Sequence, residues 1–289
     1  MKKLHPALKH SVTLLQITAA QDIGNPRTYN GTGFWIRTFD GLPALITNRH
    51  ILDPVLKSPV YNGYFIEELK VQVRETVNGE YSQKAEFVNL ILEEAQGFCH
   101  LTADVTIIID PKFCGNVTSN HYGFEPIIAI ELADEDFFLN RCEMFDPVGF
   151  LGYPENWFNT LSNMSIGRTA FLASYPEEAY GNQLTKTEDV ILVSGLSFKG
   201  SSGSPVFSQP KGLNIESKNG VIVNSPYVPP KLIGIMSGHY LDKNVDSAFS
   251  EHSGLSYFTR STAILDLLSK KNGIPVSNFI HANLKKTVR

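Results

Sequence analysis

Residues 32–48 read TGFWIRTFDGLPALITN, two apolar segments separated by a short turn. Residues 32–38 and 43–48 are rich in β-branched and aromatic side chains, and Asp40-Gly41 lies between them, so the stretch predicts a β-hairpin. Similar short segments, bounded by Gly, Pro and Asn, recur along the 289 residues. They predict further strands at 11–18, 70–77, 104–110, 147–153, 165–173, 190–194, 204–208 and 231–237. Many short strands indicate an all-β chain of the sandwich or barrel class.

Helical periodicity is convincing only near the C-terminus. Residues 261–271 (STAILDLLSKK) place their apolar side chains on one broad face, and Gly273 with Pro275 would stop this helix.

The length suits two β-units of about 100–130 residues each. A charged stretch near residues 120–145 separates two strand-rich halves. We therefore expect an N-terminal barrel over residues 1–130, a C-terminal barrel over 131–258, and a helix with a tail over 259–289.

Composition limits the classes of function. The chain is 42% hydrophobic and 19% charged with a formal net charge of −4, so a packed core is expected and a basic surface for nucleic acid is not. No run of about 18 apolar residues predicts a membrane helix. Lys9, His10 and Gln16 interrupt the region where a secretory signal would lie. The three cysteines form no C-x-x-C pair and are too few for a disulfide framework.

These observations predict a cytoplasmic protein with reduced, buried thiols. They predict neither a nucleic-acid partner nor a membrane partner. No metal-ligand spacing of the H-E-x-x-H or Cys/His kind is present, so no metal ion or other cofactor is expected.

The strongest local motif is Gly-Ser-Ser-Gly-Ser-Pro at residues 200–205. Glycines on both sides of Ser202 would let the backbone turn sharply and point the amide groups of Gly200 and Ser202 into one concave site. A serine hydroxyl is a poor nucleophile unless a base takes its proton and donors hold the developing oxyanion; such a turn supplies the donors. An ordinary Gly/Ser loop has the same composition, so the motif alone fits either interpretation.

Two further residues could serve this serine. His50 follows the predicted strand at 43–48, where packing could hold a general base at the edge of a cleft. Asp104 opens the apolar run 104–110, and a carboxylate buried there would need a partner such as an imidazole. Taken singly, they could be a core-edge histidine and a solvated acid. Together with Ser202 they stand in the order His, Asp, Ser, which is the chymotrypsin order and not that of subtilisins or α/β-hydrolases.

With these motifs the chain resembles the trypsin-like serine peptidases, especially the bacterial branch that contains the Deg and staphylococcal V8-type enzymes. The matching segments are GTGFWI, LITNRHIL, DVTIII, VGFLGYPE, SIGRTAF, GSSGSPVF and KLIGIMSG. The resemblance implies two six-stranded antiparallel β-barrels, an active site in the cleft between them, and a C-terminal α-helix, which residues 261–271 would supply. It also implies hydrolysis of peptide bonds, with a protein or peptide as substrate.

The resemblance assigns roles to the motif residues. It implies that His50 is the general base, Asp104 the acid that orients it, and Ser202 the nucleophile that forms an acyl-enzyme. The backbone amides of Gly200 and Ser202 would form the oxyanion hole.

It also implies a set of substrate-binding residues. Leu196 falls where the primary-specificity pocket often has its floor, and Met236 stands where glutamate-specific members often carry a histidine. We therefore expect a small or aliphatic side chain before the scissile bond, although the nearby His239 keeps an acidic preference open. Ser237 matches a serine beside the triad acid, in a strand that pairs with substrate backbone. The expected substrate-binding residues are Leu196, Met236, Ser237, Gly238 and His239.

Some positions depart from the usual family pattern. Ser201 replaces an Asp or Asn before the nucleophile and Ser204 replaces a common Gly, although the SGSP form occurs in the V8-type group. Because loop conformation is not written in the motif, a latent enzyme that needs an activating partner protein, or a non-catalytic module that binds peptides, stays an alternative to an active peptidase. A capsid-like or esterase function on the same fold is a third.

Overall fold

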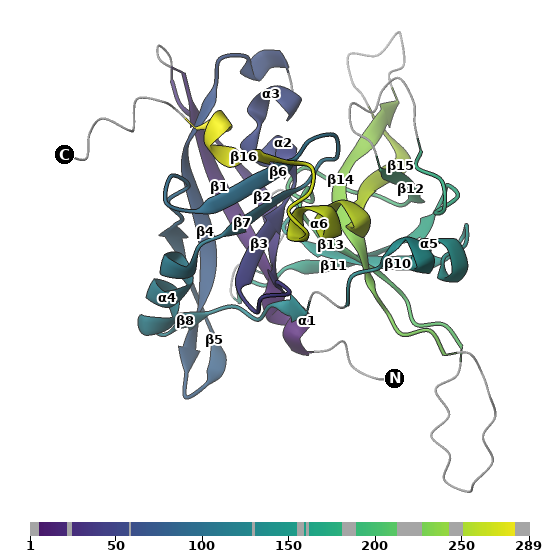
Figure 1. The fold of residues 1–289 in the computed structure, drawn as a ribbon, viewed down its shortest axis with the longest axis horizontal. Coiled ribbons are helices and arrows are strands. Elements are labelled where there is room, and N and C mark those ends of the chain that lie inside the picture. Colours follow the sequence, from purple (N-terminus) through teal and green to yellow (C-terminus); the bar gives the residue numbers. More distant parts are fainter. Residues whose placement is uncertain are drawn as a thin grey trace, which may run out of the picture.

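Two β-sheets lie side by side and account for most of the regular structure (Figure 1). A computed structural model describes residues 6–21, 25–57, 59–128, 131–154, 159, 162–180, 189–212, 227–242 and 251–280. Strands up to Ile128 belong to the first sheet and strands between Pro147 and Arg260 to the second. The prediction of a mostly β chain is confirmed.

The first sheet has ten strands among the described residues. They are β1 (Val12–Ala20), β2 (Arg27–Arg37), β3 (Pro43–Thr47), β4 (Phe65–Val77), β5 (Glu80–Asn89), β6 (Gln96–His100), β7 (Thr106–Ile109), β8 (Tyr122–Gly123), β9 (Ile127–Ile128) and β16 (Gly273–Pro275). Their order is β16-β6-β7-β3-β2-β1-β4-β5, with β8 beside β4 and β9 beside β2. The predicted hairpin is β2–β3, in which Phe34 pairs with Ile46.

This sheet differs from the six-stranded barrel expected for the N-terminal half. It contains more strands, and its pairings form an open path within the described part of the chain. β5 escapes sequence analysis because it is an edge strand whose side chains are exposed or half-buried throughout, so no apolar alternation marks it.

The second sheet is a closed six-stranded barrel in the order β10-β11-β12-β15-β14-β13, as expected for the C-terminal half. Its strands are β10 (Pro147–Gly152), β11 (Ile166–Leu172), β12 (Val190–Ser194), β13 (Pro205–Ser208), β14 (Leu232–Asp242) and β15 (Glu251–Arg260). Alternation along β10 buries Val148 and Phe150 inside the barrel.

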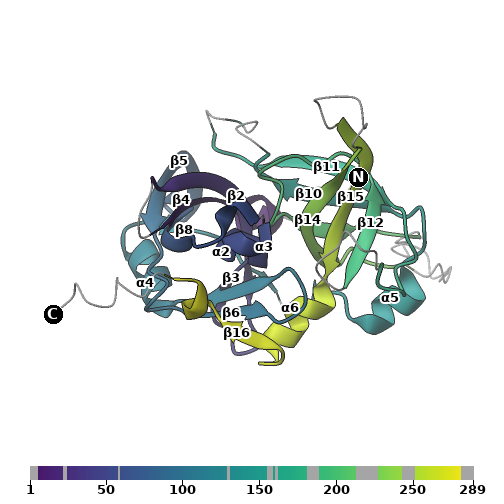
Figure 2. The ribbon, with the colours of Figure 1, turned by 90° about the horizontal axis from the view of Figure 1, so that it is seen from above.

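Short helices connect and cover the sheets. They are α1 (Pro6–Ser11), α2 (Arg49–Leu52), α3 (Pro54–Lys57), α4 (Pro111–Ser119), α5 (Glu135–Arg141) and α6 (Ser261–Leu268). α6 is the predicted C-terminal helix, and Figure 2 shows it between the two sheets. It ends earlier than predicted, at Leu268. The chain then returns to the first sheet, where β16 pairs with β6, so the C-terminal segment contributes more than a helix and a tail.

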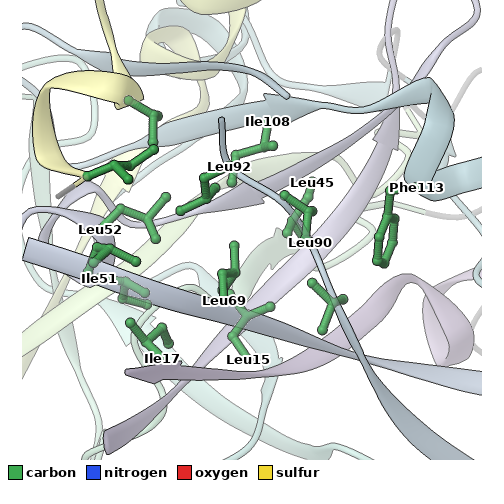
Figure 3. Packing of buried hydrophobic residues seen from close by; sticks show 14 of the residues in the cluster. Leu15, Ile17, Leu45, Ile51, Leu52, Leu69, Leu90, Leu92, Ile108 and Phe113 are labelled. Carbon is green, nitrogen blue, oxygen red and sulfur yellow. The ribbon is translucent and has the colours of Figure 1, made fainter. Parts of the chain in front are cut away.

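Apolar packing fills each sheet and the boundary between them. One cluster lies within the first sheet (Figure 3), and another fills the barrel beneath α5. A third cluster is shared: Phe34 and Ile46 of the first sheet pack with Ile235 of the barrel and with Ile264 of α6. This shared cluster holds the two sheets against each other.

The three cysteines, Cys99, Cys114 and Cys142, are free and buried, as predicted. Burial raises the pKa of each thiol to about 12, so all three are poor nucleophiles at neutral pH. Among the described helices, none combines the length and apolar character needed to cross a membrane.

The shared cluster makes α6 important for stability. We expect Ile264→Ala to lower the free energy of unfolding by about 2–5 kcal/mol, because Ile264 is fully buried and its truncation leaves a cavity between the sheets. Urea unfolding measures the change. Leu265→Ala on the same helix is the control and should cost less, since Leu265 is only partly buried. Equal losses would contradict the assigned role of the shared cluster.

Candidate active site

The predicted nucleophile Ser202 lies in the loop between β12 and β13, which contacts the first sheet directly. The amide of Thr32 donates a hydrogen bond of 2.8 Å to the Ser202 carbonyl oxygen. The next residue, Gly203, has a φ of 91°, and a Cβ at this position would overlap the carbonyl oxygen of Thr32. Only glycine combines this backbone angle with so close an approach. The glycine after Ser202 is therefore required by the contact between the sheets.

A turn over residues 198–201 precedes the serine. Ser201 N–H donates to Phe198 O at 2.9 Å, and Gly200 at the third position has a φ of 84°. This is the pattern of a type II turn, whose third residue needs a positive φ. The backbone N–H groups of Gly200 and Ser202 have no hydrogen-bond partner among the described residues. Both predicted oxyanion donors therefore have no acceptor within the described structure.

His50 lies in α2, just beyond β3, and contacts Asp104 through both its backbone and its ring. Its ring Nδ1 lies 2.7 Å from Asp104 Oδ2, and its backbone N–H donates to Asp104 Oδ1 at 2.9 Å. The Asp104 residue is only 4% exposed, so its carboxylate depends on these two donors in place of water. The geometry holds the ring with Nδ1–H facing the carboxylate and leaves Nε2 as the acceptor.

Ser237 lies close to this pair but does not bond the Asp104 carboxylate. Asn48 Nδ2 donates to both the Asp104 carbonyl oxygen, at 2.7 Å, and Ser237 Oγ, at 3.1 Å. Ser237 Oγ in turn lies 2.9 Å from Thr259 Oγ1 of the barrel. A buried polar chain thus connects the segment that carries Asp104 to β14 and β15.

His50 and Ser202 line the same cavity, which has a volume of about 530 Å³. The Ser202 hydroxyl donates to the Ser237 carbonyl oxygen at 3.4 Å, and no hydrogen bond joins it to the His50 ring in the part of the chain that is described. The structure therefore brings the three predicted residues to one site but bonds only His50 and Asp104 directly.

The predicted substrate-binding residues divide into two groups. Gly238 and His239 line the cavity. Leu196 is 52% exposed and lies outside it, while the Met236 side chain is fully buried in the core of the barrel. The expected apolar floor is therefore absent from the cavity lining. The side-chain direction in a loop, which places Leu196 outside, is not encoded by sequence spacing.

The cavity has a polar end, of which the sequence singled out only His239. Ser197 Oγ lies 3.4 Å from His239 Nδ1, and the His239 ring stacks on that of His252 with centroids 4.6 Å apart. Desolvation, His252 and Lys199 all lower the pKa of His239, and desolvation lowers that of His252. His252 is close to His239 only because β15 pairs with β14, a contact that has no local sequence signal.

No group of three or more metal-ligating side chains suited to an ion occurs within the described ranges. A comparison with protein-family models finds no matching family, and a search of curated proteins finds no match.

The approach of Gly203 to the first sheet can be tested on stability. We expect Gly203→Ala to unfold the protein or to cost far more than the roughly 1–2 kcal/mol of a left-handed alanine, because a Cβ would collide with Thr32. Gly41→Ala is a matched control, since its φ is 81° but nothing lies within 4 Å of its Cβ. Thermal unfolding of the two variants measures the difference. Similar melting temperatures would contradict the close approach.

Proposed function

We propose that the chain is a serine endopeptidase with His50, Asp104 and Ser202 as its catalytic residues. One observation carries the proposal: an imidazole braced by a buried carboxylate shares a cavity with a serine whose loop offers two unpaired amide donors. A base, a nucleophile and an oxyanion site are the three parts that acyl transfer needs.

In the proposed reaction, His50 Nε2 takes the Ser202 hydroxyl proton as Oγ attacks the carbonyl carbon of a peptide. The tetrahedral oxyanion accepts hydrogen bonds from the amides of Gly200 and Ser202. The imidazolium, stabilised by Asp104, then gives its proton to the departing amine, and the acyl-enzyme forms. A water molecule deprotonated by His50 releases the acid and restores the serine.

The edge of β14 supports a peptide as substrate. β13 pairs with β14 only over Leu232–Ile235, whereas β15 pairs with it as far as Asp242. Beside the cavity, β14 therefore has one edge without a strand partner in the described structure. An extended peptide added to this edge would lie along Gly238 and His239, as in β-strand addition.

We propose, as the finer description of the fold, that the two sheets correspond to the two β-barrels of a chymotrypsin-like enzyme, over residues 1–130 and 131–258. The first of them is an open variant in the described structure and takes one strand from the segment 259–289 that closes the C-terminus. The closed second barrel and the position of α6 between the sheets support this assignment.

A latent enzyme is the second candidate, and one observation favours it: the Ser202 hydroxyl is directed to Ser237 O and not to His50. Catalytic hydrogen bonds are often unmade without substrate, and a serine side chain rotates rapidly. The conformation of the turn at Gly200 is the better test of latency. If the peptide between Lys199 and Gly200 were flipped, the Gly200 N–H would no longer be available as an oxyanion donor. The positive φ of Gly200 and the free amides support a site that is ready without an activating partner.

The polar end of the cavity supports a polar side chain before the scissile bond. Ser197, His239 and the nearby Lys199 offer hydrogen-bond donors, and the described residues that line the cavity include no acidic side chain. We therefore propose that the enzyme accepts Glu or Gln at this position, in place of the small or aliphatic residue expected from sequence.

The catalytic assignment predicts covalent labelling by a fluorophosphonate probe. Wild-type protein should label at Ser202, Ser202→Ala should not label, and Asp104→Asn should label on the order of 10⁴-fold more slowly, because the amide would favour the wrong histidine tautomer. Mass spectrometry of the modified peptide identifies the site. Folded wild-type protein that stays unlabelled with and without candidate partner proteins would refute the proposal.

The lowered pKa of His239 predicts a pH effect on specificity. In the empty cavity its protonation is disfavoured, whereas a bound carboxylate favours it, so binding of Glu takes up a proton. For paired peptides differing only by Glu or Gln, the Glu/Gln ratio of kcat/KM should rise by roughly three- to tenfold per pH unit from pH 8 to pH 6. The ratio cancels any pH effect on the catalytic step that both peptides share.

His239→Gln is the control for this effect. It removes the titrating group, so the Glu/Gln ratio should become independent of pH. A ratio that is already flat in the wild-type enzyme would contradict the proposed role of His239, while leaving the catalytic assignment intact.

A further inference from the structure

Thr32 of β2 connects three segments through its backbone and its side chain. It is fully buried and lies in the first sheet, on the side that faces the barrel. Its N–H donates to Ser202 O at 2.8 Å, and its carbonyl oxygen accepts from Thr47 Oγ1 at 2.9 Å. Its hydroxyl lies 2.7 Å from Gly200 O and 3.0 Å from the backbone N of Tyr153. A single residue therefore contacts both ends of the segment 200–202.

The direction of the Thr32 hydroxyl is determined by its neighbours. The Tyr153 N–H can only donate, so Thr32 Oγ1 accepts from it. The Gly200 carbonyl can only accept, so it receives the one hydroxyl hydrogen. Thr32 Oγ1 thus makes both kinds of bond at once, in a residue that is fully buried.

This bond fixes the peptide between Gly200 and Ser201 at both ends. Its carbonyl oxygen is held by Thr32, and its N–H donates to Phe198 O. On the other side of Ser202, the Gly203 N–H donates to Met236 O. The peptide from Gly200 to Ser201 and the peptide from Ser202 to Gly203 are therefore both anchored, the first chiefly by a side chain and the second by backbone. The Ser202 N–H between them and the Gly200 N–H before them stay free in the described structure.

We propose that the Thr32 hydroxyl is a positioning group for the oxyanion hole: it holds the Gly200 carbonyl so that the amides of Gly200 and Ser202 converge on the cavity. The inference rests on the proposed function for its catalytic meaning. The hydrogen bond by which Thr32 holds the Gly200 carbonyl, called the clamp below, is a structural claim that does not depend on catalysis. Thr32 acts through Gly200 and does not contact the reacting atoms.

Thr32→Val tests the clamp, because valine keeps the shape and the backbone bonds but removes Oγ1. We expect fluorophosphonate labelling of Ser202 to slow by 10- to 100-fold, less than the loss on removing an oxyanion donor outright. Thr32→Ser keeps the hydroxyl and so keeps this hydrogen bond. Its labelling rate should therefore lie within about threefold of the wild-type rate. Thr13→Val is the matched control. Thr13 is buried in the neighbouring strand and its hydroxyl bonds Gln72 O of β4 and not the loop, so the Thr13→Val variant should label at the wild-type rate.

Hydrogen exchange of the segment 198–203 supplies a readout that needs no activity. Its amides should exchange faster in Thr32→Val than in Thr32→Ser or Thr13→Val, at matched distance from each melting temperature. Unchanged exchange in Thr32→Val would overturn the clamp, whether or not the protein labels. Faster exchange with an unchanged labelling rate would overturn its catalytic role. Wild-type protein that never labels, combined with faster exchange in Thr32→Val, would refute the proposed function and the catalytic role but retain the clamp.

Discussion

The apolar layer between the two sheets is the constraint on which the rest of the structure depends. Phe34 and Ile46 of the first sheet pack against Ile235 of the barrel and Ile264 of α6, all fully buried. No single hydrogen bond across this boundary could hold two sheets together, because each contributes only about 1 kcal/mol net. Apolar burial supplies the larger share of the association energy. The polar contacts between the loop of Ser202 and β2 are made inside an interface that packing has already closed.

Packing alone would let the two sheets settle in several nearby positions, and the buried polar groups restrict that freedom. Thr32 and Asn48, both fully buried, each bond a partner on the other side of the boundary: Thr32 bonds Gly200 O and Asn48 bonds Ser237 Oγ. Leaving a buried polar group without its partner costs more free energy than a typical hydrogen bond contributes. Such groups therefore favour one relative position of the two sheets over slightly shifted ones. The same groups surround Asp104 and Ser202. The proposed catalytic geometry and the registration of the sheets are thus determined by one set of contacts.

Local patterns in the sequence predicted the parts of the protein that are built locally. The β2–β3 hairpin and helix α6 follow from strand periodicity, turn residues and helix stops, whereas the closed second barrel was implied only by the family resemblance. His50, Asp104 and Ser202 could be singled out because each stands beside its own short motif, and the structure brings all three to one site. β5 was missed because an exposed edge strand needs no apolar face. His239 was singled out, but its contact with His252 was missed because the two residues meet through strand pairing.

The outward direction of Leu196 and the proposed role of Thr32 have a common physical origin. Both depend on which way a side chain points when a loop meets another element, and neither spacing nor composition encodes that direction. For Leu196 the loop turns the side chain outward, and the cavity is lined by Ser197 instead. For Thr32 the alternation of β2 puts the hydroxyl on the barrel side, where the Gly200 carbonyl completes its hydrogen bonding. Motifs can therefore single out the proposed reacting groups of such a site, whereas the groups proposed to select substrate and to hold the backbone emerge only from the contact between the two sheets.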